Sequence, residues 1–193
     1  MLTRQLLLSA VAVVAAVPTT RAANFEVDPS HTSVVFSVSH LGYSYTYGMF
    51  RDVKGTVEFD KASPEACKFR FTIDAASLNT MNEKRDEHLK GADFFNVKQF
   101  PQITFESTAV APAASADGKT LYNVTGKMTM HGVEKEVTLP IELLGEGETP
   151  FKDYRAGFMC QTTLKRSDFD MDFMVGPIGD SIGVTVSFEA VKK

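Results

Sequence analysis

Hydrophobic and polar residues alternate with a period of two along most of the chain after residue 24. In residues 33–39, for example, Val34, Phe36 and Val38 are separated by single residues, of which Ser37 is polar. Successive side chains of a β-strand point to opposite faces, so this pattern predicts strands with one buried and one solvated face. Such strands are typical of antiparallel sheets. With this segment, the alternation predicts about eight strands, the others lying near 56–59, 67–74, 103–106, 124–130, 136–142, 158–165 and 181–188.

Turn-forming residues separate these segments. Polar, Gly- or Pro-containing stretches lie at 61–65, 116–119 and 145–150. The pair His131-Gly132 stands alone between two alternating segments and predicts a tight hairpin. We therefore expect the chain to run up and down through neighbouring strands.

Two segments depart from the alternation. Residues 82–91 contain good helix formers and end in Gly91, which predicts one short, mostly polar helix. Residues 169–180 form an irregular stretch rich in Met, Phe and Gly. We expect the helix to lie over one end of the sheet.

Strands with one apolar face must pack that face against another layer, in a sandwich or in a closed barrel. Long strands favour closure, because closure removes the exposed sheet edges. The fold class expected is therefore all-β, an antiparallel barrel of about eight strands, which has room for side chains or for one small ligand. With 15 Phe, 8 Met and no Trp, the interior is apolar. Composition alone leaves open whether it is filled or holds a cavity.

The N-terminus has the layout of a secretory signal peptide. Arg4 precedes the apolar residues 6–17, and Thr20-Arg21-Ala22 offers a cleavage site, so we expect residues 1–22 to be removed and 23–193 to form one exported domain. The apolar run is too short for a membrane span, and stable membrane insertion is not expected. Loss of two arginines changes the net charge from −4 to −6, which argues against nucleic acid as a partner.

The two cysteines, Cys67 and Cys160, both fall on expected inward faces. An exported protein permits a disulfide between them. They could equally remain small buried hydrophobes. Their separation does not suit a metal-ligand pair.

Five stretches of the sequence resemble those of one known family. They are FEVDPSHTSVVFSVSHLGYSYTYGMF (25–50), VKGTVEFD (53–60), the segment 73–107 with its Arg-Asp-x-His-Leu helix and Pro-x-Ile-x-Phe strand, VTGKMTMHGVEKEVTLPI (124–141), and RAGFMCQTTLKRSDFDM (155–171). In this order and density they are similar to the YceI-like family of periplasmic polyisoprenoid-binding proteins. The resemblance covers almost the whole chain after residue 24.

The resemblance implies an extended lipocalin-like barrel with a helix near its mouth. It also implies a periplasmic protein whose cavity binds an isoprenoid chain, such as a polyprenyl or quinone tail, or a similar long-chain amphiphile, with no cofactor and with homodimers possible. The sequence departs from the family pattern at Asp170, Met128, Met130 and His131. These changes would alter the cavity lining.

Candidate ligand-binding residues follow from the inward faces of the strands and from the irregular stretch 169–180. Alternation from Phe36 and Val38 places His40 inward near the strand end, where it could meet a polar head group. Arg85 and Arg166 suit a phosphate, although an ion pair or a structural role would also account for them. The expected apolar lining comprises Phe36, Val38, Phe59, Phe69, Phe71, Phe105, Met128, Phe158, Leu164, Phe173 and Met174.

The remaining histidines, His31, His88 and His131, are interpreted as hydrogen-bonding or solvated residues, because metal sites need three or four converging ligands. No nucleophile motif with an attendant base is present, so neither a metal nor a catalytic residue is expected. The favoured function is binding, transport or sequestration of an isoprenoid-type lipid. The alternatives are a stress-response or interaction protein with a filled barrel, and a redox partner acting on a bound quinone.

Overall fold

The computed structural model of the protein describes residues 22–115 and 117–193. The predicted signal peptide lies outside the described residues, apart from its last residue, Ala22. In the described part, strands dominate, and the one α-helix is α1 (Glu83–Lys90), with Asn82 as its N-cap and Gly91 as its C-cap. The strands are β1 (Ala23–His40), β2 (Ser44–Phe50), β3 (Val53–Phe59), β4 (Lys68–Asp74), β5 (Leu78–Asn79), β6 (Gln102–Ala113), β7 (Thr120–Met130), β8 (Val133–Glu148), β9 (Tyr154–Lys165) and β10 (Ile178–Lys192), with short 3-10 helices η1 (Pro64–Ala66), η2 (Ala75–Ser77) and η3 (Arg166–Phe169).

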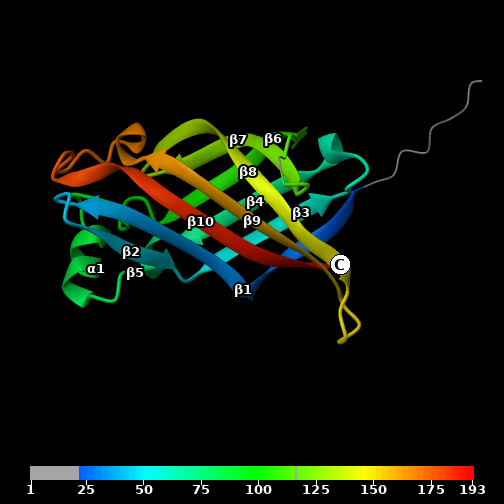
Figure 1. The fold of residues 1–193 in the computed structure, drawn as a ribbon. Coiled ribbons are helices and arrows are strands. Elements are labelled where there is room, and N and C mark those ends of the chain that lie inside the picture. The colour runs from blue at the N-terminus through cyan, green and yellow to red at the C-terminus, as the bar shows by residue number, and fades with distance from the viewer. Residues whose placement is uncertain (1–21, 116) are drawn as a thin grey trace, which may run out of the picture.

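Eight of these strands close into an antiparallel barrel, as the alternation predicted. Their order is β10-β9-β8-β7-β6-β4-β3-β1, and β1 pairs again with β10, so the ring has no free edge. The strands β2 and β5 extend the wall beyond this ring at one end, beside α1 (Figure 1). The connection between β9 and β10 lies at the same end, whereas the C-terminus lies at the other (Figure 1).

Strand β1 belongs to two parts of the wall. Its first residues, from Ala23 to Glu26, pair with β3, whereas Val34 to His40 pair with β2. Between them the register with β10 shifts, which marks a bulge of the kind that bends a strand. The bend allows one long strand to serve both the narrow ring and its extension.

The hairpin between β7 and β8 has the predicted two-residue turn. Both central residues, His131 and Gly132, have positive φ angles of 52° and 78°, as the tight hairpin turn requires. The ring of His131 packs on Phe100 with centroids 4.9 Å apart, and His131 Nδ1 lies 3.0 Å from the carbonyl oxygen of Phe169. The hairpin is therefore tied to the loops around the barrel end.

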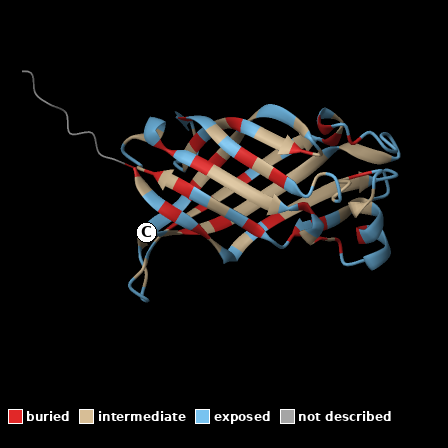
Figure 2. Ribbon diagram, turned by 180° about the vertical axis from the view of Figure 1, so that it is seen from behind, coloured by how far each residue is buried: buried red, intermediate tan, exposed pale blue. Residues whose placement is uncertain are grey.

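The barrel interior contains two clusters of buried residues. One centres on Phe69 and Phe158, both fully buried, with Phe59 and Phe188 packed around them. The other includes Val34, Phe50, Ile103, Met130 and Phe169 and lies toward the end that carries α1. In parts of several strands, among them β3, β7 and β9, buried residues are separated by single, more exposed ones (Figure 2). The first cluster fills one half of the barrel, so the interior is partly a packed core.

The possible disulfide is absent, because Cys67 and Cys160 are both free and both buried. The Cys67 thiol donates weakly to backbone carbonyls of the loop after β3, those of Asp60 and Ser63. Burial raises the pKa of the Cys160 thiol to about 11. Both cysteines act as small core residues, the alternative that the sequence had left open.

None of the helices in the described part of the chain is long and apolar enough to cross a membrane.

Candidate functional site

An apolar cavity occupies the end of the barrel that carries α1. Its volume is about 390 Å³, toward the lower end of the roughly 300–1,000 Å³ typical of small-molecule sites. The lining residues come from strands β1, β2, β7, β9 and β10, from α1, and from the loops beside it. They are Val34, Phe36, Val38, His40, Leu41, Thr46, Phe50, Arg85, His88, Leu89, Phe94, Phe95, Met130, Leu164, Arg166, Met171, Met174, Ile178, Ile182 and Val184.

The strand walls follow directly from the period-two pattern. On β1 every second residue from Val34 to His40 lines the cavity, and on β10 the same holds for Ile182 and Val184. The two strands are antiparallel neighbours, and Phe36 pairs with Val184 and Val38 with Ile182. A largely apolar wall therefore runs inward from the mouth.

Aromatic rings join the two sides of the mouth. His88 of α1 packs edge-on against Phe94 and Phe173, with ring centroids 5.1 Å and 5.8 Å away, and Phe94 contacts Phe173 at 5.5 Å. Phe173 belongs to the β9–β10 connection, whereas His88 and Phe94 belong to the helix and the loop after it. His88 Nε2 also lies 3.0 Å from Asp93 Oδ2, which fixes the imidazole ring in this cluster.

Arg166 is buried, with 5% of its surface exposed. Its guanidinium donates to three backbone carbonyls, those of Gly179 at 3.0 Å, Met171 at 2.5 Å and Ile178 at 3.1 Å. Burial lowers the pKa of Arg166 from its ordinary value, and Asp180 partly opposes this. The side chain thus holds both ends of the β9–β10 connection, and each of its three nitrogen atoms donates to the backbone.

Arg85 has a different setting on the exposed side of the mouth. Its Nε donates to Thr80 Oγ1 at 2.8 Å and its Nη2 to the Thr80 carbonyl at 2.7 Å. Thr80 is in turn held by Asp86, whose Oδ1 accepts from the Thr80 backbone N–H at 2.8 Å and from its hydroxyl. The guanidinium is oriented by neutral oxygen atoms and faces the cavity.

The structure divides the predicted site residues into three groups. Around the cavity it brings together four of the predicted apolar residues and all three predicted head-group residues: Phe36, Val38, Leu164, Met174, His40, Arg85 and Arg166. Phe173 lies at the mouth in the ring cluster. Phe59, Phe69, Phe71, Phe105, Met128 and Phe158 lie instead in or against the packed core, because alternation fixes the face of a residue but not its depth along the barrel.

Several lining residues were missed as site residues from the sequence. Val184 and Ile182 carried the inward pattern, and only their depth was unknown. Leu89 and Phe94 were expected as apolar contacts of the helix, without a place in the cavity. Met130 also carried the inward pattern, at the end of the segment 124–130, and its depth was unknown as well. No periodic signal marks the loop residue Met171 as part of a site, because its position depends on how the loops fold over the barrel end.

One group of side chains in the described residues could in principle hold a metal ion. Asp28, His31 and Glu189 have ligand atoms within 4.8 Å of one another. However, Arg155 donates to Asp28 at 2.6 Å and to Glu189 at 2.9 Å, and His31 Nδ1 lies 2.9 Å from Asp28. Arg155 thus already pairs with both carboxylates, so the group is an ion-pair network that fastens the β1 bulge.

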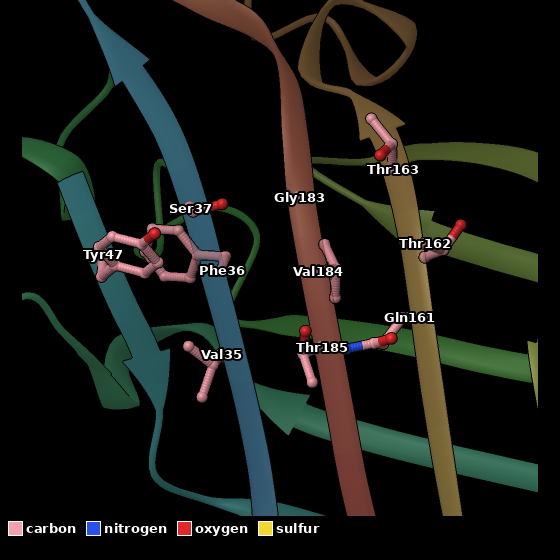
Figure 3. A pocket seen from close by; sticks show the side chains of 10 residues that line it. All are labelled: Val35, Phe36, Ser37, Tyr47, Gln161, Thr162, Thr163, Gly183, Val184 and Thr185. Atoms are coloured by element: carbon pink, nitrogen blue, oxygen red, sulfur yellow. The ribbon is translucent and has the colours of Figure 1, made fainter. Parts of the chain in front are cut away.

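A second hollow, of about 320 Å³, lies on the barrel wall and is more open. Figure 3 shows that its side chains come from four neighbouring strands, β2, β1, β10 and β9. Its lining includes small and polar residues such as Ser37, Thr163 and Thr185. It lacks the enclosing apolar walls of the cavity at the barrel end.

The fold and the cavity define a closed antiparallel β-barrel with an apolar cavity at one end. The YceI-like domain model matches residues 25–190, and the chain belongs to this family. A UPF0312 protein of Ectopseudomonas mendocina (strain ymp) is 40% identical over 89% of both chains. Protein YceI of Escherichia coli O17:K52:H18 (strain UMN026 / ExPEC) is 40% identical over 89% of this chain and 88% of its own.

Solved structures agree with this assignment. BcnA of Burkholderia cenocepacia superposes with a TM-score of 0.75 and 28% identity, covering 84% of this chain and 98% of its own. A polyisoprenoid binding domain from Saccharophagus degradans gives a TM-score of 0.70 over 89% of this chain and 99% of its own, at 13% identity, which is a likeness of fold alone.

Proposed function

We propose that this protein binds the chain of an isoprenoid-type lipid, such as a polyprenyl or quinone tail, in the cavity at the barrel end, and carries or sequesters it without catalysing a reaction. The observation that carries the proposal is an aliphatic and aromatic cavity that opens at one end, with its few polar groups at or near the mouth. Such a site suits a long apolar chain with a polar head. The polyisoprenoid binding domain from Saccharophagus degradans, which shares the fold, agrees with this ligand class.

The driving force is the removal of the apolar chain from water. Burial contributes roughly 25 cal/mol per Å², or about 0.8 kcal/mol per methylene group. Each isoprene unit that enters the cavity therefore adds several kcal/mol before the cost of immobilising the chain. A cavity of about 390 Å³ encloses only part of a long tail, so the remainder extends through the mouth or requires a deeper cavity.

The periplasm is the proposed site of action. The predicted signal peptide at residues 1–22 supports export, and a carrier between two membranes needs to shield such a lipid from water. Expression of the full chain in a Gram-negative bacterium, followed by osmotic-shock release, tests this directly. Recovery of a shortened chain beginning at residue 23 supports the proposal, and retention of the intact chain in the cytoplasm contradicts it.

The binding test uses the same purified protein. Native mass spectrometry before and after addition of farnesol is expected to show one lipid per chain, identified after solvent extraction. Leu164→Asp places a charge in the cavity and should abolish uptake, whereas Thr163→Asp changes the neighbouring exposed position and should leave uptake intact. Wild-type protein that carries no lipid and takes up no farnesol would contradict the proposed function.

A further inference from the structure

The ionisable residues that line the cavity all carry or can acquire positive charge. They are His40, Arg85, His88 and Arg166, and no aspartate or glutamate lines this cavity in the described part of the chain. This contrasts with the chain as a whole, which is acidic. The cavity thus presents an apolar interior beneath basic side chains.

Of the two arginines, Arg85 is the exposed one and has more donors left for a ligand. Arg166 uses its guanidinium on the carbonyls of Gly179, Met171 and Ile178 and is buried. Arg85 donates only to the Thr80 side chain and carbonyl, through Nε and Nη2. Since a guanidinium has five N–H donors, three of these donors have no protein acceptor among the residues that the structure describes.

The carboxylates of Asp86 on α1, of Asp93 after it and of Asp180 in β10 bind other groups. Asp86 accepts from the Thr80 backbone and hydroxyl, Asp93 lies 3.0 Å from His88, and Asp180 accepts from Ser167 at 2.9 Å. Among the described residues, no acid lies within ion-pair distance of Arg85. Thr80, held by Asp86, fixes the Nε and Nη2 edge of the guanidinium and leaves the charge available at the mouth.

We propose that Arg85 is the counter-ion of an acidic head group, a carboxylate or a phosphate monoester, on the lipid that the cavity binds. The inference rests on the proposed function, because it places the head at the mouth and the apolar chain inside. A guanidinium matches the geometry of both anions and forms charge-assisted hydrogen bonds with them. Because Arg85 is exposed, salt will weaken the interaction.

The test compares pairs of probes that share one chain and differ in charge. Farnesyl phosphate is matched with farnesol, and farnesoic acid with methyl farnesoate, and affinities are measured by isothermal titration calorimetry. The acidic member of at least one pair is expected to bind about tenfold or more tightly than its neutral partner. Which pair shows this preference distinguishes a phosphate head from a carboxylate head.

Variants distinguish a specific contact between Arg85 and the head group from a general effect of the protein's net charge. Arg85→Gln should remove the preference for the acidic probe, so that the two members of a pair bind with similar affinity, while Arg85→Lys should retain part of the preference. Lys84→Gln removes the same charge one residue away, outside the cavity lining, and should change the affinities less than about twofold. Circular dichroism and urea unfolding, which should match those of the wild-type protein, show that Arg85→Gln is folded.

Two results would overturn the inference, and they differ in what they leave standing. If farnesol binds but neither acidic probe binds more tightly, or Arg85→Gln behaves as Lys84→Gln does, the head-group role fails and the proposed function remains. If no probe binds to the wild-type protein, both fail together.

Discussion

Phe71 and Phe188 meet edge-on inside the barrel, with ring centroids 5.0 Å apart. Phe188 belongs to the packed core, whereas Phe71 packs against both buried clusters. Further along β10, Val186 also contacts both clusters, and Val184 lines the cavity. Phe71 is not itself a lining residue, but because it packs against both clusters we place the floor of the cavity at its level, where the packed half of the barrel ends.

Replacing Phe71 with alanine is expected to deepen the cavity toward Phe188. A longer chain such as geranylgeraniol should then gain affinity relative to farnesol, because more of it can leave water. Phe71 is only half-buried, so the loss in unfolding free energy should fall below the roughly 3–5 kcal/mol typical of Phe→Ala in a core. Calorimetric titration with both alcohols and urea unfolding measure the two effects.

Phe158→Ala is the matched control for the cavity floor. Phe158 is fully buried and contacts Phe59, Phe69 and Phe188, so its replacement should cost about 3–5 kcal/mol. The ratio of the two affinities should not change. An equal gain for the longer alcohol in both variants would argue against a floor at Phe71.

The contrast between these two residues shows what the sequence could predict of the fold. Both lie on inward faces, and alternation identified them as such, together with the closed sheet and the helix at 82–91. Alternation says nothing of height along the barrel axis, which depends on strand tilt and register. The floor level and the bend of β1 come from long-range pairing that no local pattern encodes.

Arg166 should be important for stability and for the order of the β9–β10 connection. Arg166→Gln removes the charge and at least one of the three bonds to the carbonyls of Gly179, Met171 and Ile178. Because a buried acceptor left without a donor is costly, we expect a loss of about 2–4 kcal/mol. Urea unfolding and hydrogen exchange at residues 171–179 measure it, and a loss below about 0.5 kcal/mol would contradict the structural role.

The network around Asp28 predicts a pH-dependent contribution to stability. Hydrogen bonds from Ser30, His31 and Arg155 hold the pKa of Asp28 well below its ordinary value of 3.8. A carboxyl group with a depressed pKa stabilises the fold fully at pH values above its ordinary pKa. This contribution is lost as the pH falls from the ordinary pKa toward the folded-state pKa. Asp28→Asn should therefore lower the melting temperature by several degrees at pH 7.

Below about pH 4 the wild-type melting temperature should approach that of Asp28→Asn. Asp52→Asn is a suitable control, since Asp52 is half-exposed and lies 3.9 Å from Lys54 in a weak surface pair. Circular dichroism from pH 3 to pH 8 follows all three proteins. A difference between wild type and Asp28→Asn that stays constant over this range would contradict the network.

Two glycines with positive φ test the packing of the β7–β8 hairpin. A Cβ at Gly132 would lie 2.5 Å from Phe100 Cε1, whereas a Cβ at Gly118 would meet nothing within 4 Å. Gly118→Ala should cost about 1 kcal/mol through backbone strain alone. Gly132→Ala should cost more, because Phe100 must also move. Equal losses in urea unfolding would show that the contact with Phe100 contributes nothing.

The candidate site was less accessible from the sequence than the fold. His40 could be placed correctly because it continues the alternation from Phe36 and Val38. Arg85 and Arg166 could not be distinguished, since the difference between them is whether carbonyls from another segment reach the guanidinium. The same holds for Met171, which reaches the cavity only because the β9–β10 connection folds back over the barrel.

The central claim, that an apolar chain lies in the cavity at the barrel end, is tested most directly by methionine-methyl NMR. Met130, Met171 and Met174 line the cavity, whereas Met49 and Met81 are exposed outside it. With ¹³C-labelled methionine methyl groups and added farnesol, we expect shifts and intermolecular NOEs at the three lining residues and none at the two exposed ones. Saturable binding that leaves the three lining signals unchanged would contradict the account.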